Sequence, residues 1–94
     1  MKHWNITVRG KVQGVYFRLT TKAVADQLGV KGFVLNQSDG SVYIEAEGDD
    51  FALRELLEFC QEGPERAEVD DVDYTEVSDI KGFKNFEVLK RKTK

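Results

Sequence analysis

Residues 3–29 read HWNITVRGKVQGVYFRLTTKAVADQLG, a stretch in which the spacing of apolar residues changes partway along. Its first part alternates apolar and polar side chains, which predicts a strand over residues 3–9 with one buried face. Apolar side chains then recur at helical spacing, which predicts a helix over residues 17–28 that ends at Gly29 in the left-handed conformation. The stretch is therefore a strand, a glycine-bearing loop and a helix.

A hairpin follows the first helix. Residues 32–37 form a short apolar run, and residues 42–47 alternate apolar and polar side chains. Between them stand Asp39 and Gly40, a dipeptide typical of two-residue turns between antiparallel strands. We therefore predict two strands joined by a tight turn.

The second helix is the clearest element of the chain. Apolar side chains recur at i, i+3, i+4 and i+7, as one buried helix face requires. This stripe consists of Leu53, Leu56, Leu57 and Cys60. Asp49 or Asp50 is available as the N-cap, because a negative charge suits the positive end of the helix dipole. Gly63 and Pro64 end the helix, since proline cannot continue it.

Two further strands are predicted after the second helix. Residues 67–77 form the longer one, and the slip in its alternation between Val69 and Val72 indicates a bulge. Phe86 and Val88 mark a short final strand. The element order βαββαβ, with this extra strand, predicts an α+β fold of the ferredoxin-like type, in which an antiparallel sheet carries both helices on one face.

Composition bounds the class of protein. The chain has 94 residues, of which 40% are hydrophobic and 33% charged, as suits one small globular domain. We expect this domain to span residues 1–90, followed by a basic tail at residues 91–94. A single cysteine, Cys60, excludes an internal disulfide and a cysteine-based metal site. The sequence shows no membrane-length apolar run and no signal-peptide pattern, so we expect a cytoplasmic monomer that does not bind membranes.

The charges are unevenly distributed. The net charge is −3, yet residues 1–40 carry six basic and two acidic side chains, whereas residues 41–80 carry two basic and fourteen acidic ones. A positive segment in a chain with a pI near 5.1 favours a small anionic ligand over nucleic acid. An RNA-binding module on the same topology is the weakest alternative. Residues 31–33 and 81–83 begin like an RNA-recognition signature but do not continue as one.

The glycine-bearing loop is the candidate binding site. It runs from Gly10 to Arg18 and enters the first turn of a helix, where backbone amides lack partners and carry partial positive charge. Glycines allow such amides to converge on an anion, and the forked guanidinium of Arg18 can hold two phosphate oxygens. The loop residues that we expect to bind the substrate are Val12, Gln13, Gly14, Val15, Tyr16 and Phe17. A purely structural turn is the alternative.

Other phosphate chemistries need residues that this loop does not have. A magnesium-binding Walker loop needs Lys-Ser/Thr after Gly14, and a cysteine phosphatase needs a thiolate at the position of Val12. Cys60 is interpreted as a buried structural thiol. His3 is interpreted as a packed or solvated side chain with no acidic partner nearby in the sequence. We therefore predict no metal, no cofactor and no covalent phosphoenzyme.

A site without histidine, thiolate or metal can still hydrolyse an acyl phosphate. The leaving group is a carboxylate whose conjugate acid has a pKa of about 4, so no general acid is needed. The protein then has to neutralise the phosphoryl charge and hold a water in line with the breaking bond. A neutral amide side chain suffices for the second task.

Two motifs resemble those of the acylphosphatase family. They are Gly10-x-Val12-Gln13-Gly14-Val15-x-Phe17-Arg18, and Gly32-Phe33-Val34-Leu35-Asn36 followed by Asp39-Gly40-Ser41-Val42. The resemblance covers residues 4 to about 89. It implies that Arg18 binds the phosphoryl group together with the loop amides and that Asn36 orients the attacking water.

The resemblance implies a hydrolase that cleaves the carboxyl–phosphate bond of a small acyl phosphate by in-line attack of water. The proton of the water passes to a phosphate oxygen, because Asn36 cannot act as a general base. Phosphate or sulfate is expected to compete for the loop. One alternative is a non-catalytic accessory domain that binds acyl or carbamoyl phosphate, as in larger hydrogenase-maturation proteins. For Asn36, the alternative is a strand-end residue that caps the hairpin.

Overall fold

The computed structural model of the chain describes residues 1–89. Its elements, in chain order, are β1 (Lys2–Lys11), α1 (Phe17–Leu28), β2 (Lys31–Asn36), β3 (Val42–Gly48), α2 (Asp50–Glu62), β4 (Glu68–Val77) and β5 (Phe86–Val88). This is the predicted order of strands and helices, with the extra short strand at the end. The expected domain boundary at residue 90 and the expected tail at residues 91–94 lie outside the described residues.

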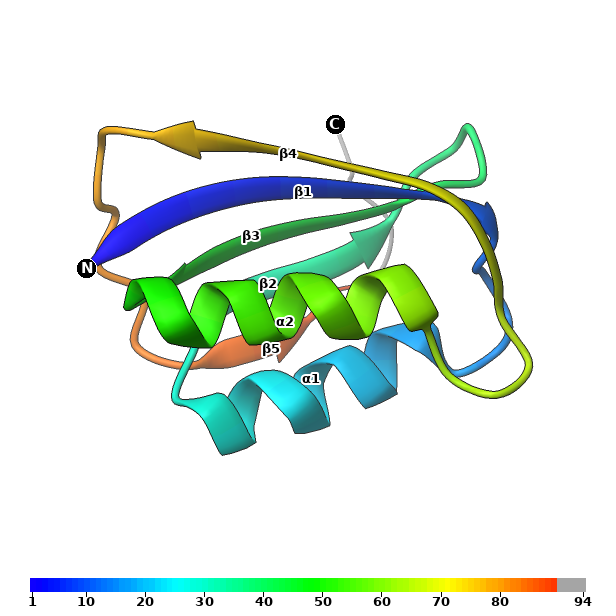
Figure 1. The fold of residues 1–94 in the computed structure, drawn as a ribbon, viewed down its shortest axis with the longest axis horizontal. Helices are drawn as coiled ribbons and strands as arrows, with labels where there is room; N and C mark the ends of the chain where they lie inside the picture. Colours follow the sequence, from blue (N-terminus) through cyan, green and yellow to red (C-terminus); the bar gives the residue numbers. More distant parts are fainter. Residues whose placement is uncertain (90–94) are drawn as a thin grey trace.

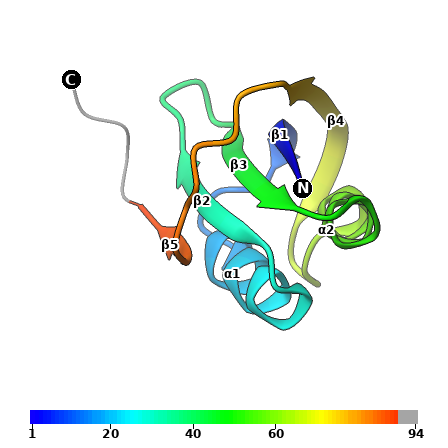
Figure 2. The same ribbon diagram turned by 90° about the vertical axis from the view of Figure 1, so that its left-hand side faces the viewer.

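The five strands form one sheet in the order β4-β1-β3-β2-β5. Both helices cover the same face of this sheet (Figures 1 and 2). The strands β4 and β5 are neighbours in the sequence but lie at opposite edges. The segment between them crosses the face that the helices leave open (Figure 2). The predicted α+β class and its two-layer, ferredoxin-like arrangement are confirmed.

The sheet is mixed rather than fully antiparallel, which corrects one detail of the prediction. The four longer strands pair antiparallel, whereas β5 pairs parallel with β2, with Gly32 opposite Phe86. The reason is the direction in which each strand runs. Because β3 and β4 run opposite to β1 and β2, a chain that reverses after β4 runs beside β2 in the same direction. This pairing brings the end of β5 next to the end of β2.

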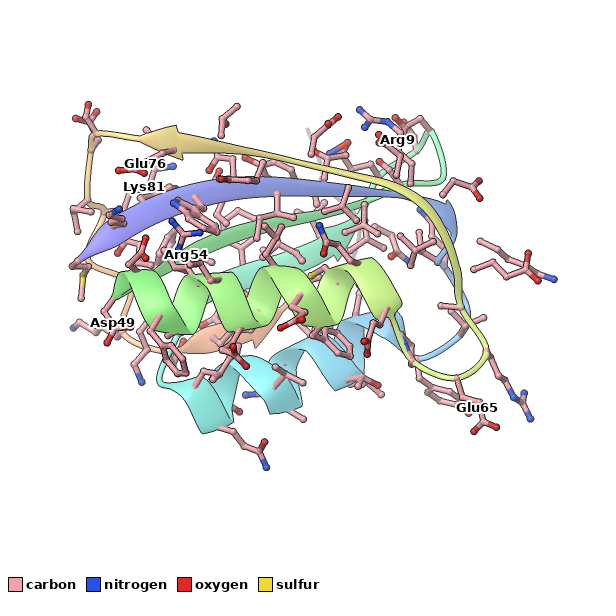
Figure 3. The ribbon with its side chains drawn as sticks, in the orientation of Figure 1. Arg9, Asp49, Arg54, Glu65, Glu76 and Lys81 are labelled. Carbon is pink, nitrogen blue, oxygen red and sulfur yellow. The ribbon has the colours of Figure 1, made fainter. Side chains whose placement is uncertain are left out.

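Local signals decide where the helices begin and end. The helix α1 ends at Gly29, whose φ of 77° is left-handed and whose N–H donates to two carbonyls of the last turn. The helix α2 begins after Asp49, whose carboxylate accepts from the Ala52 N–H at 2.8 Å (Figure 3). Asp49 is therefore the N-cap, while Asp50 lies inside the helix and forms ion pairs with basic side chains.

The predicted bulge lies in β4, opposite the end of β1. Arg9 faces Asp71 and Gly10 faces Val69, so Asp70 is the extra residue. Gly10 has a φ of 131°, and a Cβ at this position would collide with the backbone of β4. Glycine is thus required at this close approach of β1 to β4, and the chain leaves the sheet for the loop directly afterwards.

The core lies between the sheet and the two helices. Ile6 and Ile44 from the sheet, Phe17 from α1 and Leu53 from α2 are among its fully buried side chains. Cys60 is fully buried among them, and burial raises the pKa of its thiol to about 12. The interpretation of this cysteine as a buried structural thiol is confirmed. Within residues 1–89, no helix is long and apolar enough to cross a membrane.

His3 is packed rather than solvated. Its side chain is 1% exposed, and its Nδ1 lies 2.7 Å from Oε2 of Glu47, which faces it across the β1–β3 pairing. Glu47 also accepts from backbone N–H groups of residues 81–83, in the segment that crosses the open face of the sheet. The acidic partner of His3 is therefore remote in the sequence, and strand pairing brings it close.

Candidate functional site

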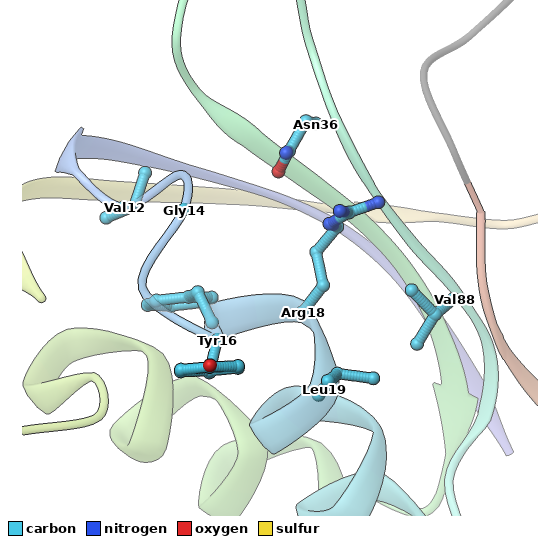
Figure 4. Close-up of a pocket in the computed structure, with 8 residues that line it drawn as sticks. Val12, Gly14, Tyr16, Arg18, Leu19, Asn36 and Val88 are labelled. Atoms are coloured by element: carbon cyan, nitrogen blue, oxygen red, sulfur yellow. The ribbon is translucent and has the colours of Figure 1, made fainter.

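One cavity of about 400 Å³ opens beside the N-terminus of α1. The loop after β1, the first turn of α1, the end of β2 and the end of β5 form its walls (Figure 4). Its lining residues are Val12, Gly14, Tyr16, Phe17, Arg18, Leu19, Asn36 and Val88. The cavity therefore brings together Arg18 and Asn36, the two residues that the sequence predicts as catalytic.

The first turn of α1 differs from that of α2 in having no acceptor of its own. In α2, Asp49 caps the helix and Asp50 adds a negative charge. In α1 the N-cap residue is Tyr16; no described side chain accepts from the first amides, and the first turn contains no acidic residue. The unpaired amides and the positive end of the helix dipole lie at the cavity, where they can bind an anion.

The loop backbone adopts an unusual conformation before the helix. Gly14 has a φ of 73° and Tyr16 a φ of 63°, and Tyr16 is the one non-glycine residue with positive φ in the described part of the chain. This conformation costs a bulky residue on the order of 1 kcal/mol. Positive φ angles at two positions so close together are typical of the nests in which successive amides bind an anion.

Arg18 extends from the first turn of α1 toward the end of β2 (Figure 4). Its Nη1 donates to the carbonyl oxygen of Leu89 at 2.8 Å, which occupies one of its five N–H donors. Arg9 and Arg54 pair with aspartates, whereas Arg18 forms no ion pair with a carboxylate of residues 1–89. The charge of Arg18 is therefore available to an anionic ligand.

Asn36 ends β2 on another side of the cavity. Its side chain faces the guanidinium of Arg18 (Figure 4), and its Oδ1 is buried without a hydrogen-bond partner among the described residues. A buried carbonyl oxygen that is left unpaired costs about 1–3 kcal/mol. An acceptor in this state beside a cationic side chain is suited to bind a water molecule.

The six predicted substrate-binding residues fall into two groups. Those that line the cavity are Val12, Gly14, Tyr16 and Phe17. Gln13 points elsewhere, because its Nε2 donates to the carbonyls of Gln37 at 2.8 Å and Ser41 at 2.9 Å. Val15 packs against the core. The side chain of Gln13 therefore holds the loop against the turn between β2 and β3, and the side chain of Val15 does not line the cavity.

Two lining residues were missed by the sequence reasoning. Leu19 follows Arg18 in the first turn of α1, and its side chain is exposed at the cavity. An apolar residue next to the arginine that is predicted to bind an anion is a signal that the sequence does contain. Val88 comes from β5, and nothing in this short strand indicates that it pairs with β2.

Other reactive side chains lie away from the cavity. Cys60 is in the core, and His3 is hydrogen-bonded to Glu47. The described residues contain no cluster of three or more histidine, cysteine, aspartate or glutamate side chains placed to hold a metal ion. The lining residues include no thiol, imidazole or carboxylate. What the arrangement can do is bind an anion and orient a water molecule next to it.

Comparisons of the sequence and of the structure with known proteins point to the same family. The acylphosphatase family model matches residues 4–88. An acylphosphatase from Marinobacter nauticus is 46% identical over 86 residues, which cover 92% of this chain and 94% of the relative. The crystal structure of acylphosphatase from Bacillus subtilis matches with a TM-score of 0.92 at 36% identity, over 95% of this chain and 99% of that one.

A domain of this kind also occurs inside a larger protein. The crystal structure of full-length HypF, in its phosphate- and nucleotide-bound form, matches 96% of this chain at 30% identity and a TM-score of 0.87, but only 12% of the HypF chain is covered. The predicted family resemblance and enzyme class, a hydrolase of acyl phosphates, are confirmed by the full-length relatives. On this evidence, the chain belongs to the acylphosphatase family.

Proposed function

We propose that the cavity hydrolyses acyl phosphates by direct attack of water, with Arg18 binding the phosphoryl group and Asn36 orienting the water. The observation that carries this proposal is the buried, unpaired Oδ1 of Asn36, which faces Arg18 beside the uncapped end of α1. A phosphoryl group between the loop and Arg18 lies next to that oxygen. A water bound there is then within reach of phosphorus.

The phosphoryl group binds at the loop between Val12 and Phe17. Its negative charge meets the loop amides and the positive end of the α1 dipole. The guanidinium of Arg18 adds a charge-assisted, forked contact, and its bond to Leu89 restricts its orientation before the substrate arrives. Inorganic phosphate and sulfate present the same oxygens, so they compete for this position.

The chemical step is a single in-line displacement. Oδ1 of Asn36 accepts a hydrogen bond from the water, and the water oxygen attacks phosphorus. The bond between phosphorus and the acyl oxygen breaks, and the carboxylate leaves with the bonding electrons. Asn36 has no basic site, so the proton of the water passes to a non-bridging phosphate oxygen. The products are a carboxylate and inorganic phosphate.

The reaction needs neither a general acid nor a covalent intermediate. The leaving carboxylate has a conjugate acid with a pKa of about 4, so it departs without being protonated. Catalysis then consists of electrostatic stabilisation by amides and a cation that are already in place. We therefore propose a metal-independent enzyme that forms no phosphoenzyme.

A second candidate is a binding domain without turnover. The similarity to a small part of HypF favours it, since that chain carries such a domain within a longer protein. Acyl or carbamoyl phosphate would then bind at the same loop and remain intact. Binding and product release measured on the same sample separate the two candidates, because both need Arg18 but only hydrolysis needs Asn36.

We also propose that the enzyme acts as a monomer in the cytoplasm. The cavity is formed within one chain, and Cys60 is a free buried thiol, which suits a reducing compartment. Light scattering of the purified chain tests the first part. A mass near 10.7 kDa supports the monomer, and a mass of about twice that contradicts it.

Release of phosphate from acetyl phosphate tests the mechanism in wild type, Arg18→Ala and Asn36→Ala, with and without a chelator. We expect turnover that is insensitive to the chelator. Arg18→Ala should raise KM roughly 30-fold or more, because a lost charge-assisted contact costs about 2–4 kcal/mol. Asn36→Ala should lower kcat about 100-fold and leave phosphate inhibition nearly unchanged. Turnover lost with the chelator, or an unchanged kcat in Asn36→Ala, contradicts the proposal.

A further inference from the structure

The cavity is larger and more apolar than a phosphoryl group requires. Arg18, Asn36 and the backbone at Gly14 form its polar side. The remaining side chains of its wall are Val12, Tyr16, Phe17, Leu19 and Val88. Of these, Tyr16 is 69% exposed and Leu19 is 59% exposed, so two large apolar side chains stand together at the cavity with little protein against them.

The chemistry decides which side of the cavity receives the acyl group. In an in-line displacement, the attacking water and the leaving group lie on opposite sides of phosphorus. Figure 4 shows Asn36 on one side of the Arg18 guanidinium, and Tyr16 and Leu19 on the other. A water held by Asn36 therefore directs the acyl group toward Tyr16 and Leu19, with Val88 beside them.

We propose that Tyr16, Leu19 and Val88 form an acyl subsite, through which the enzyme prefers acyl phosphates with an apolar acyl group. This inference rests on the proposed mechanism, from which the direction of the leaving group is taken. When a phenyl ring or a branched alkyl chain binds there, apolar surface of both the acyl group and the subsite is removed from water. An acetyl group covers less of this surface, and a carbamoyl NH₂ would lose water against Leu19 and Val88, whose side chains offer it no acceptor.

The neighbouring groove does not favour a second anionic group on the acyl chain. It continues from Leu19 and Val88 past Lys22 and Glu87. The Nζ of Lys22 already lies 2.8 Å from Oδ2 of Asp26 and 3.1 Å from a carbonyl oxygen of β5, while Glu87 adds negative charge. Lys22 is therefore already paired, Glu87 would repel a second phosphate, and the apolar class of substrate is the one that the wall fits.

Phosphonates test the subsite without a leaving group. Methylphosphonate and phenylphosphonate present the same phosphonate group, but only phenylphosphonate carries a ring in the direction of the acyl group, and inhibition is compared at a pH where both are dianions. We expect phenylphosphonate to inhibit about tenfold more strongly. Leu19→Ala and Tyr16→Asn should each reduce this ratio about threefold, asparagine being chosen because it tolerates the positive φ of residue 16. Equal inhibition of the wild type by both phosphonates overturns the proposal.

Substrates provide the second measurement. The value of kcat/KM for benzoyl phosphate, divided by that for acetyl phosphate, should fall about fivefold in Leu19→Ala. Phe51→Ala is the matched control, because Phe51 is also an exposed apolar side chain in the first turn of a helix but does not line the cavity. Its ratio should equal that of the wild type.

The outcomes separate this inference from the function on which it rests. An unchanged ratio in Leu19→Ala, or an equal fall in Phe51→Ala, overturns the acyl subsite while hydrolysis stands. A wild type that hydrolyses neither substrate overturns the proposed function and the subsite with it. A ratio that falls in Leu19→Ala alone, together with the expected phosphonate preference, supports the subsite.

Discussion

Gln13 ties the loop between β1 and α1 to the residue that follows Asn36, since its Nε2 donates to the carbonyl oxygen of Gln37 at 2.8 Å. A second hydrogen bond, of 2.9 Å, reaches the carbonyl of Ser41 on the other side of the turn. Gln37 and Ser41 are themselves joined through the backbone at 2.8 Å. These contacts set the separation between the loop, where the phosphoryl group is proposed to bind, and Asn36.

Gln13→Met is therefore expected to impair the chemical step more than anion binding. Methionine has a similar length but no N–H donor, so the loop and Asn36 lose their fixed separation, and a small misplacement of a catalytic group can cost about 100-fold. We expect kcat to fall at least about tenfold, with phosphate inhibition changed by less than about threefold. The measurement is steady-state kinetics with acetyl phosphate.

The same substitution made in Asn36→Ala distinguishes positioning from general damage. If Gln13 acts through Asn36, Gln13→Met lowers kcat no further in that background. Lys31→Met serves as the control, because Lys31 is an exposed residue at the start of β2, away from the loop and the turn, and its kcat should match the wild type. An equal loss of kcat in both backgrounds contradicts a positioning role for Gln13.

Asn36→Leu is expected to make the protein more stable and inactive. Its Oδ1 is buried without a partner in the described residues, so an apolar side chain of similar volume removes an unfavourable term of about 1 kcal/mol or more. Urea unfolding measures the stability, and phosphate release measures the activity. A variant less stable than the wild type shows that Oδ1 is well paired in solution, and one that keeps its kcat contradicts the catalytic role of Asn36.

Because of Glu47, we expect the free energy of unfolding to vary with pH in the acidic range. Burial on its own raises the pKa of Glu47, but hydrogen bonds from His3 and from the backbone amides of residues 81–83 outweigh it and hold this pKa below its usual value. A carboxyl with a lowered pKa in the folded state stabilises the fold above its unfolded pKa of about 4.3. That contribution is lost as the pH falls through the folded pKa.

Glu47→Gln is therefore expected to be less stable than the wild type by about 1–3 kcal/mol near neutral pH, where the ionised carboxylate is paired. The difference should shrink as the pH falls below about 4.3. Urea unfolding over this pH range measures it. Glu55→Gln, at an exposed position of α2, is the control and should differ little from the wild type at any pH. A deficit in Glu47→Gln that stays constant with pH contradicts the prediction.

Cys60→Ala is expected to lower the free energy of unfolding by about 1–2 kcal/mol and to leave kcat and KM unchanged. The thiol is fully buried in the core, and burial raises its pKa to about 12, so it also reacts slowly with thiol reagents in the native protein. Unfolding and kinetic measurements on the same preparation check both points. Lost activity in a well-folded variant contradicts a purely structural role.

Short-range interactions explain why much of this protein can be predicted. The bounds of α1, its left-handed end at Gly29 and the cap at Asp49 depend on residues only a few positions apart. The candidate binding loop is recognisable for the same reason, since its glycines and Arg18 lie within nine residues of one another. The chemical inventory of the site, an arginine and an amide without thiol or imidazole, is thus readable from the amino-acid sequence alone.

Contacts between residues that are distant in the sequence could not be predicted, and only the tertiary structure reveals them. The parallel pairing of β5, the bond between His3 and Glu47 and the bracing of the loop by Gln13 join segments with no local signal for each other. Which strands pair depends on how the whole sheet buries its apolar face and on the entropy cost of closing long chain segments. Neither quantity can be read from a short stretch of sequence. The pairing of β5 with β2 placed Val88 at the cavity beside Leu19 of α1, and so completed the apolar side of the cavity wall.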